Sequence, residues 1–474
     1  MKRSMHKLAQ LDHQYVWHPF TQMRDWLKEE PIVLTEAKGA VLRDIKGKEY
    51  LDANSSIWTN LHGHNHPAIN RALKKQLGKL SHSSALGFAN EPASLLAERL
   101  ISSAKLRRGI RGNPRLTKVF FSDNGSTALE VALKLSYEST RRTRPGIKPR
   151  FLGIDGAYHG DTVGAVSVGH IDLFHKAYSG LLFQSQKVMA PYCYRCPFNK
   201  AKPERADARS YRKCRFECID KVESAFDKAK KKSQPITSFL YEPLMQGAAG
   251  FIPQPKTWLR QAAEIARAHG AQLIADEVMT GFGRCNKGTD RLFASHQEGV
   301  QPDFLCLAKG LSGGYLPMAA TLTTKKVFDA FLGEYEEFKS FFHGHSFTGN
   351  QLGASASLAS LELLSQTRTS NARQSLQQTL ASGIKNLWSL PQVGDIRQTG
   401  NVVGIELVRD WRTRAPYPLP EQAGIRVCRA LAKRGVLTRP VGSVIVLMPP
   451  YCTTMRQART MVSSLGEAIT EALG

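Results

Sequence analysis

The chain has 474 residues, of which 42% are hydrophobic and 22% charged, and its formal net charge is +25. This composition is typical of globular proteins and excludes a disordered or fibrous chain. No apolar run reaches the ~18 residues of a membrane span, and the basic N-terminus lacks the apolar core of a secretory signal. We therefore expect a folded, cytoplasmic protein with no membrane partner.

The excess of positive charge is distributed along the chain in short clusters, such as Arg141–Arg142 and Lys228–Lys232. A strongly basic balance can mark a nucleic-acid-binding surface, but such proteins usually concentrate the charge on one motif. This sequence contains no recognisable motif of that kind. A solvated basic surface is therefore the preferred interpretation, and no nucleic-acid partner is expected.

The N-terminal part of the chain favours a β-hairpin. Gly39–Asp44 and Glu49–Asp52 are two strand-like runs joined by a short turn that contains a glycine. The C-terminal part, after about residue 355, predicts a long helix, then a meander at Val393–Val408, a helix near 421–434 and a strand at Val444–Met448.

Between these ends, short apolar runs alternate with helical patterns. The candidate strands are Lys118–Phe121, Arg150–Ile154, Ser238–Tyr241, Ala271–Ala275 and Phe304–Leu307, and the clearest helices are Ser126–Arg141 and Lys256–His269. Such alternation predicts an α/β fold, with a mostly parallel sheet between helices and ligands at the carboxyl ends of the strands.

We divide the chain into a large domain and a smaller α+β domain built from both termini. The large domain is predicted at residues 66–350, and the smaller domain combines residues 1–65 with residues 351–474. A polar insertion at 193–235, rich in Lys, Arg and Cys, belongs to the large domain.

Ionisable residues stand at the ends of two candidate strands. Asp276 follows the run that ends at Ala275, and Lys309 follows the run that ends at Leu307 and precedes a glycine-rich turn. A lysine facing a pocket can form a Schiff base with a carbonyl cofactor, and a carboxylate keeps the pyridine nitrogen of pyridoxal phosphate protonated. A strand-end lysine alone is usually a solvated surface residue, but the two residues together indicate this cofactor.

A phosphate site is predicted where the first candidate strand of the large domain meets a helix. Gly125 permits close approach, Ser126 supplies a hydroxyl, and amides at a helix start bind phosphate. Taken alone, this segment is equally consistent with an ordinary capping box from Thr127 to Glu130. Tyr158 lies in a glycine-flanked loop, where its ring could stack on a pyridine, although a loop tyrosine is usually only a packed surface residue.

These motifs resemble a known family. LIADEVMTGFGR, AKGLSGG, NGSTALEVALKL and YHGDT are similar to the class III pyridoxal-phosphate aminotransferases, over nearly the whole chain. The resemblance implies a fold type I transferase, pyridoxal 5′-phosphate as cofactor, and a homodimer with active sites at the subunit interface. VWHPFTQM, SSIWTNLHGHNHP and LTRPVGSVIVLMPPY resemble one branch, the diaminopelargonic acid aminotransferases of biotin biosynthesis, which convert 8-amino-7-oxononanoate to 7,8-diaminononanoate.

The resemblance implies a role for each matching residue of the cofactor site. Lys309 binds the cofactor covalently and carries a proton during the reaction, and Asp276 pairs with the pyridine nitrogen. Gly125 and Ser126 hold the phosphate, while Tyr158 stacks on the ring and borders the substrate.

Other matching residues lie outside these motifs. The segment HGHSFTGN resembles the loop that reaches the partner subunit's phosphate, which implies that His345 and Ser346 contact the cofactor and that Gly344 borders the substrate. Arg439 matches the arginine that receives the substrate carboxylate, a task that suits a buried, planar guanidinium. Arg284 is expected to be structural.

Phe20, Ile57 and Trp58 are the remaining predicted substrate-side residues. Family members that use S-adenosylmethionine as amino donor carry two adjacent tryptophans where this chain has Ile57-Trp58, and a tyrosine where it has Phe20. An adenine and a sulfonium need aromatic surface, whereas lysine needs none. By family frequency we predict S-adenosylmethionine as the donor, with L-lysine as the alternative.

Four of the eight cysteines, Cys193, Cys196, Cys214 and Cys218, have a spacing that a structural zinc site could use. Free thiols are the preferred interpretation, because the family's chemistry needs no metal and a cytosolic chain tolerates reduced cysteines. No metal site is predicted.

The leading hypothesis is therefore an enzyme, an aminotransferase. The alternatives are a class III ω-amino acid aminotransferase with another substrate and, more remotely, a nucleic-acid-associated protein on a degenerate enzyme fold. The complete set of Asp276, Lys309 and Ser126 argues against degeneracy.

Overall fold

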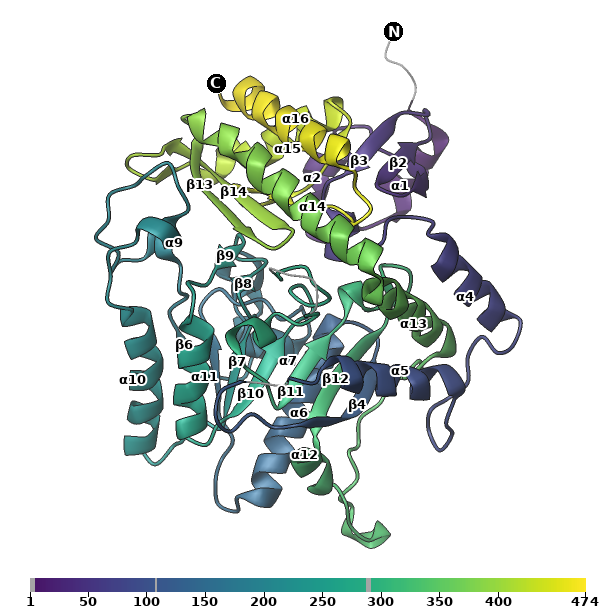
Figure 1. Ribbon diagram of the computed structural model, residues 1–474, viewed down its shortest axis with the longest axis vertical. Helices are drawn as coiled ribbons and strands as arrows, with labels where there is room; N and C mark the ends of the chain where they lie inside the picture. Colours follow the sequence, from purple (N-terminus) through teal and green to yellow (C-terminus); the bar gives the residue numbers. More distant parts are fainter. Residues whose placement is uncertain (1–4, 107–108, 287–290) are drawn as a thin grey trace.

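A seven-stranded sheet lies at the centre of the computed structural model, which describes residues 5–106, 109–286 and 291–474 (Figure 1). The strand order is β4 (Leu116–Ser122), β12 (Ala319–Thr324), β11 (Phe304–Leu307), β10 (Gln272–Asp276), β7 (Ser238–Tyr241), β5 (Phe151–Ile154) and β6 (Gln186–Val188). The strands pair in parallel except at β12, which runs antiparallel to β11 and β4. The predicted α/β fold with a mostly parallel sheet is confirmed.

Side chains of the central strands alternate between two helical layers. In β7, Phe239 and Tyr241 pack into one hydrophobic core and Leu240 into another, and β10 and β11 repeat this alternation. One layer contains α5 (Glu91–Ser103), α10 (Glu217–Lys231), α11 (Trp258–Ala268) and α13 (Gln351–Ser365), and the other contains α6 (Gly125–Thr143), α7 (Val163–Val168) and α12 (Lys325–Asp329). Because both faces are covered, these strands are apolar throughout, which made them recognisable in the sequence.

Two central strands and a helix are among the elements of the large domain that escaped prediction. The strands β6 and β12 lack a run of large apolar residues, although every residue of β12 is buried. The helix α10 lies within the polar insertion, and its buried Ile219, Val222 and Phe226 join the same core as α11. This part of the insertion is therefore an amphipathic helix that packs on the domain.

Both ends of the chain build the smaller domain, shown at the top of Figure 1. The predicted hairpin is present as β2 (Val41–Asp44) and β3 (Glu49–Asp52), with β1 (Leu34–Lys38) beside β2. The C-terminal strand β16 (Val436–Leu437) pairs in parallel with β3. This pairing joins segments that are almost 400 residues apart in the chain, so both ends of the chain contribute to one sheet.

A second sheet completes the smaller domain, with β13 (Val393–Thr399), β14 (Val402–Asp410), β18 (Val444–Leu447), β17 (Pro440–Val441) and β15 (Ala415–Pro416). It shares a hydrophobic core with α14 (Thr367–Gly383), α15 (Ala423–Lys433) and α16 (Met455–Leu473).

Shorter elements connect these layers: α1 (Lys7–Tyr15), α2 (Met23–Trp26), α3 (Ser55–Trp58), α4 (Pro67–Leu77), α8 (Asp172–His175), α9 (Ala208–Tyr211), and the ribbon of β8 (Met245–Gln246) and β9 (Ile252–Pro253). Within the described residues, no helix combines the length and the apolar character that a membrane crossing requires.

A buried ion-pair network on β13 and β14 ties the smaller domain to the large domain at Tyr192 and Gly250. Arg397, on β13, is fully buried and lies 2.8 Å from Glu406 Oε2 and 3.2 Å from Asp395 Oδ2. Its guanidinium also donates to the Tyr192 hydroxyl at 2.8 Å and to the Gly250 carbonyl at 2.7 Å. The guanidinium therefore compensates two carboxylates that have almost no access to water.

Replacing Arg397 with alanine should lower the free energy of unfolding by about 3–5 kcal/mol, because it leaves the buried Asp395 carboxylate without its counter-charge, whereas Glu406 keeps Arg195 at 2.6 Å. The control is Arg409→Ala, which removes a half-exposed ion pair with Glu421 and should cost about 0–1 kcal/mol. Urea denaturation measures the free energy of unfolding of both variants. Equal midpoints would contradict a larger contribution of Arg397 to stability.

Candidate functional site

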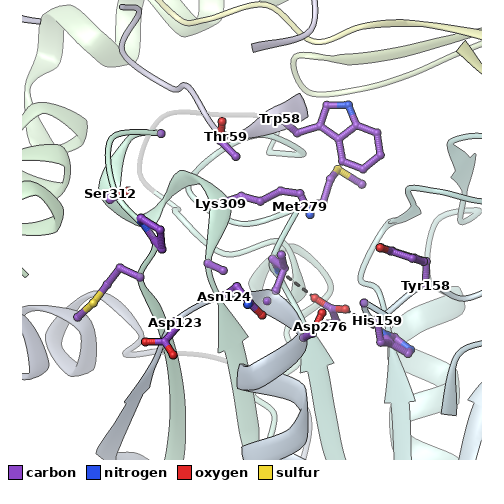
Figure 2. A pocket seen from close by; sticks show the side chains of 18 of the residues that line it. Trp58, Thr59, Asp123, Asn124, Tyr158, His159, Asp276, Met279, Lys309 and Ser312 are labelled. Carbon is purple, nitrogen blue, oxygen red and sulfur yellow. Dashed lines mark hydrogen bonds and ion pairs between the residues drawn. The ribbon is translucent and has the colours of Figure 1, made fainter. Parts of the chain in front are cut away.

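The carboxyl ends of the central strands meet at one cavity of about 400 Å3. Its walls come from the segments that follow β4, β5, β7, β10 and β11, together with Trp58 from the smaller domain (Figure 2). Parallel strands end at the same edge of a sheet, so polar residues placed after different strands converge there. Six predicted site residues line this cavity: Trp58, Gly125, Ser126, Tyr158, Asp276 and Lys309.

Lys309 begins the turn that follows β11, and its backbone has a positive φ of 28°. Its ammonium nitrogen lies 5.4 Å from the centre of the Trp58 ring. Burial lowers the pKa of this amine below its ordinary value, while the charges of Asp276 and Glu242 oppose that effect. A buried amine with a lowered pKa is more readily available as the neutral nucleophile.

Asp276, the last residue of β10, forms a buried pair with His159 (Figure 2). Nδ1 of His159 donates to Oδ2 of Asp276 at 2.7 Å, and the amide of Val278 donates to Oδ1 at 3.0 Å. Burial alone would lower the pKa of His159, but the hydrogen bond and the charge of Asp276 raise it above its ordinary value. The two donors therefore fix the Asp276 carboxylate at the wall of the cavity.

Glu242 lies directly after β7 and also lines the cavity. Its carboxylate accepts hydrogen bonds from the amides of Tyr158 at 3.1 Å and Gly247 at 2.7 Å. Burial raises the pKa of Glu242 to about 7, against the opposing charge of His159. Glu242 was not predicted from the sequence and His159 was given no role, although Glu242 stands at a strand end as Asp276 does.

Tyr158 reaches the cavity from the loop after β5. Its hydroxyl donates to Asp161 Oδ2 at 2.6 Å, and burial together with this bond raises the pKa of the phenol. The backbone amide of Asp161 donates in turn to the Ser126 hydroxyl at 3.2 Å. The loop that carries the aromatic ring is thus bonded to the start of α6.

The start of α6 has the features of an anion site. Asn124 caps the helix by accepting from the Thr127 amide at 3.0 Å, so the amides of Gly125 and Ser126 remain to bind a ligand. A Cβ atom at Gly125 would lie 2.7 Å from a methyl of Val278, and one at Gly160 would lie 1.9 Å from the Ser126 hydroxyl. The backbone can approach this closely only where glycine is present.

The other predicted site residues do not line this cavity. Phe20, Ile57 and Arg439 are exposed in the single chain, so the expectation that the Arg439 guanidinium is buried is not met here. Gly344 and Ser346 are exposed as well. His345 lies 3.0 Å from Asp123, a residue of the cavity wall.

Arg284 has the structural role that the sequence analysis expected. Its guanidinium is buried and donates to the carbonyls of Pro449 at 2.8 Å and Asn60 at 3.0 Å. It therefore joins the segment after Trp58 to the end of the C-terminal sheet.

The four cysteines of the insertion, Cys193, Cys196, Cys214 and Cys218, line one small cavity. Cys214 accepts a hydrogen bond from the Arg212 guanidinium at 3.0 Å. Across the part of the chain that the structure describes, no three His, Cys, Asp or Glu side chains are placed to hold a metal ion. The zinc hypothesis therefore gains no support from the arrangement of these thiols.

This fold and this set of residues define a pyridoxal-phosphate-dependent aminotransferase. The family model described as Aminotransferase class-III matches residues 23–469, and the chain belongs to this family. It is similar to the adenosylmethionine-8-amino-7-oxononanoate aminotransferase of Geobacter sulfurreducens, with 44% identity across 98% of this chain and 97% of that protein. The corresponding enzyme of Aquifex aeolicus is 41% identical over 98% of this chain and 97% of that protein.

Solved structures agree with this membership. The adenosylmethionine-8-amino-7-oxononanoate aminotransferase of Methanocaldococcus jannaschii matches with a TM-score of 0.87 and 38% identity, over 98% of this chain and 99% of that chain. An omega transaminase of Pseudomonas jessenii in complex with PMP matches with the same TM-score and 25% identity, over 98% of both chains. The predicted family, fold and enzyme class are confirmed.

The cofactor of this family is pyridoxal phosphate, and the residues present fit it. Gly125 and Ser126 provide the amides at a helix start that a phosphate needs. His159 supports the Asp276 carboxylate, and its second ring nitrogen is buried with no hydrogen-bond partner among the described residues. Lys309 faces the same cavity, so the predicted cofactor is confirmed by family and consistent with the site.

Glu242→Gln should flatten the pH dependence of the stability of the cofactor-free protein. The folded-state pKa of Glu242 lies above its ordinary value, so its contribution to stability is complete below about pH 4.5 and is lost as pH rises through about 7. Between about pH 4.5 and 7, the free energy of unfolding of the wild type should fall by about 3 kcal/mol more than that of the variant. Urea unfolding between pH 4.5 and 7.5 measures both slopes, and parallel curves would show that Glu242 does not titrate there.

Proposed function

We propose that this protein transfers an amino group to 8-amino-7-oxononanoate, giving 7,8-diaminononanoate in biotin biosynthesis, with S-adenosylmethionine as donor. The observation that carries the proposal is its similarity, over nearly the full length, to enzymes named for this reaction in several organisms. The cavity with Lys309 and the Asp276–His159 pair supplies the groups that transamination needs.

When bound, pyridoxal phosphate supplies a carbonyl that carries the amino group and a ring that accepts electrons. Lys309 is assigned to covalent attachment and to moving a proton at its amine, because it is the buried amine of the cavity and has a lowered pKa. Asp276, supported by His159, is assigned to the ring nitrogen. Tyr158 is assigned to the ring face and the substrate border.

Gly125 and Ser126 are assigned to the phosphate, and His345, Ser346 and Gly344 to the site of a second subunit. We propose a cytoplasmic homodimer, and the exposure of Gly344 and Ser346 in the single chain supports the dimer. Arg439 is assigned to the substrate carboxylate and is exposed in the same way. A partner subunit that covers Arg439 would strengthen its pairing with a carboxylate.

L-lysine is the second candidate donor. Trp58 lines the cavity, but Ile57 offers no π face and its side chain is 45% exposed. Lysine as a donor needs no stacking surface, so an isoleucine at position 57 is compatible with lysine. Another ω-amino acid substrate remains the second candidate acceptor, favoured by the fold shared with the Pseudomonas jessenii enzyme.

Lys309→Ala should lower transamination by about 1,000-fold or more, because covalent attachment and proton transfer depend on one amine. Noncovalent cofactor binding should persist through the phosphate site and Asp276. The matched control is Lys187→Ala, a half-buried lysine on β6 outside the cavity, which should retain activity. Turnover of the Lys309 variant within tenfold of wild type would contradict the assignment.

The two half-reactions test the substrates separately. Each donor is mixed with the cofactor-loaded protein, and loss of the visible absorbance reports amino transfer. We expect a rapid loss with S-adenosylmethionine; loss with lysine alone would overturn this donor and leave the acceptor proposal intact.

The acceptor half-reaction is measured in the wild type and in Arg439→Lys. The variant should bind 8-amino-7-oxononanoate more weakly and keep the donor half-reaction, because lysine retains the charge but loses the planar fork. Failure of the wild type to use this acceptor would refute the proposed function.

A further inference from the structure

The segment Ser55–Trp58 adopts a left-handed turn without a glycine. The φ angles of Ser55, Ser56, Ile57 and Trp58 are 47°, 49°, 64° and 70°, and the ψ angles of Ser56 and Ile57 are 52° and 53°. A β-branched residue in this region is a genuine outlier. Such strain persists only where the surrounding structure imposes it.

The buried carboxylate of Asp52 holds this turn. Oδ1 accepts from the amides of Asn54 at 3.1 Å and Ser56 at 3.2 Å, and Oδ2 accepts from the Ser56 hydroxyl at 3.2 Å. Nε2 of His64 donates to Oδ2 at 2.9 Å. Asp52 is the last residue of β3, so the clamp is anchored in a sheet rather than in a loop.

The turn determines where Trp58 and Ile57 point. The indole of Trp58 is buried, its Nε1 donates to Asn54 Oδ1 at 2.8 Å, and its ring packs edge-on against Phe251. Figure 2 shows this ring above Lys309, whose nitrogen is 5.4 Å from the ring centre. Ile57, one residue earlier, is half exposed. A right-handed turn would direct the Cα–Cβ bond of Trp58 elsewhere.

We propose that Asp52 is a positioning residue, whose carboxylate holds Ser55–Trp58 in the left-handed turn and thereby keeps the Trp58 ring over Lys309. The inference rests on the proposed function and deepens it, since a residue outside the cavity positions the Trp58 side chain of the substrate-side wall. Asp52 acts through the backbone of Asn54 and Ser56 and through the Ser56 side chain.

Asp52→Asn and Asp44→Asn form a matched pair for the test. Asp44 is likewise a buried aspartate in the same sheet, and it accepts from the amides of Lys46 and Lys48 and from the Tyr50 hydroxyl. Its contacts lie in the hairpin turn and do not include the Trp58 segment. Loss of stability should therefore be common to both variants, and a change at Trp58 should be specific to Asp52→Asn.

Two readouts are measured on protein saturated with pyridoxal phosphate. The near-ultraviolet circular dichroism of Trp58, defined as the difference between wild type and Trp58→Phe, should be lost in Asp52→Asn and retained in Asp44→Asn. The kcat/KM for 8-amino-7-oxononanoate should fall about tenfold or more in Asp52→Asn, since misplacing a substrate-side group is costly. In Asp44→Asn it should change less than about twofold.

Ile57→Gly supplies a rescue. Glycine adopts positive φ without steric cost, so this substitution alone should raise the unfolding temperature by about 1–3 °C. In the Asp52→Asn background it should restore the Trp58 dichroism and part of kcat/KM, because the turn then needs less support. The double variant also keeps the test open if Asp52→Asn alone folds poorly.

Equal dichroism and equal kcat/KM in Asp52→Asn and Asp44→Asn would overturn the proposal, as would the absence of rescue by Ile57→Gly. If the wild type does not use 8-amino-7-oxononanoate, the proposed function fails, but the dichroism comparison still decides the role of Asp52. The two failures are therefore distinguishable.

Discussion

The hydrogen bond between His159 and Asp276 is the interaction on which the site depends. It is 2.7 Å long, almost without access to water, and joins the loop after β5 to the end of β10. An ionised carboxylate at this depth is costly unless donors surround it, and the bond from His159 and the Val278 amide provide them. Lys309 and Glu242 face the same cavity, so the ionisable groups form one coupled unit rather than independent residues.

Left-handed backbone is present on both sides of the cavity where the two domains meet. Trp58 and Lys309, which face each other, have φ angles of 70° and 28°. Left-handed backbone costs about 1–2 kcal/mol per residue, and it is retained here by contacts with the rest of the fold. Arg284 contributes by joining the segment after Trp58 to Pro449. Rigid positioning of side chains at a reacting centre is a recognised use of such strain.

Most of the central sheet could be predicted because its strands are covered on both faces and are therefore continuous apolar runs. The same rule failed for β12, where small residues and threonines are buried without a strong pattern. It failed for α10 because many lysines masked the apolar face of that helix. Asp276 was identified by its place after a strand, and Glu242 could have been identified by the same criterion.

The sequence by itself determined most of the central strands, the α/β class, and the family, since these depend on local periodicity and on short motifs. Only the tertiary structure brought His159 and Glu242 to Lys309 and separated the environments of Ile57 and Trp58. The physical reason is that these arrangements depend on contacts between distant segments, such as the bond from the Ser55 hydroxyl to the Met448 carbonyl, 393 residues away. Local patterns carry no information about which distant group will complete a hydrogen bond or impose a backbone angle.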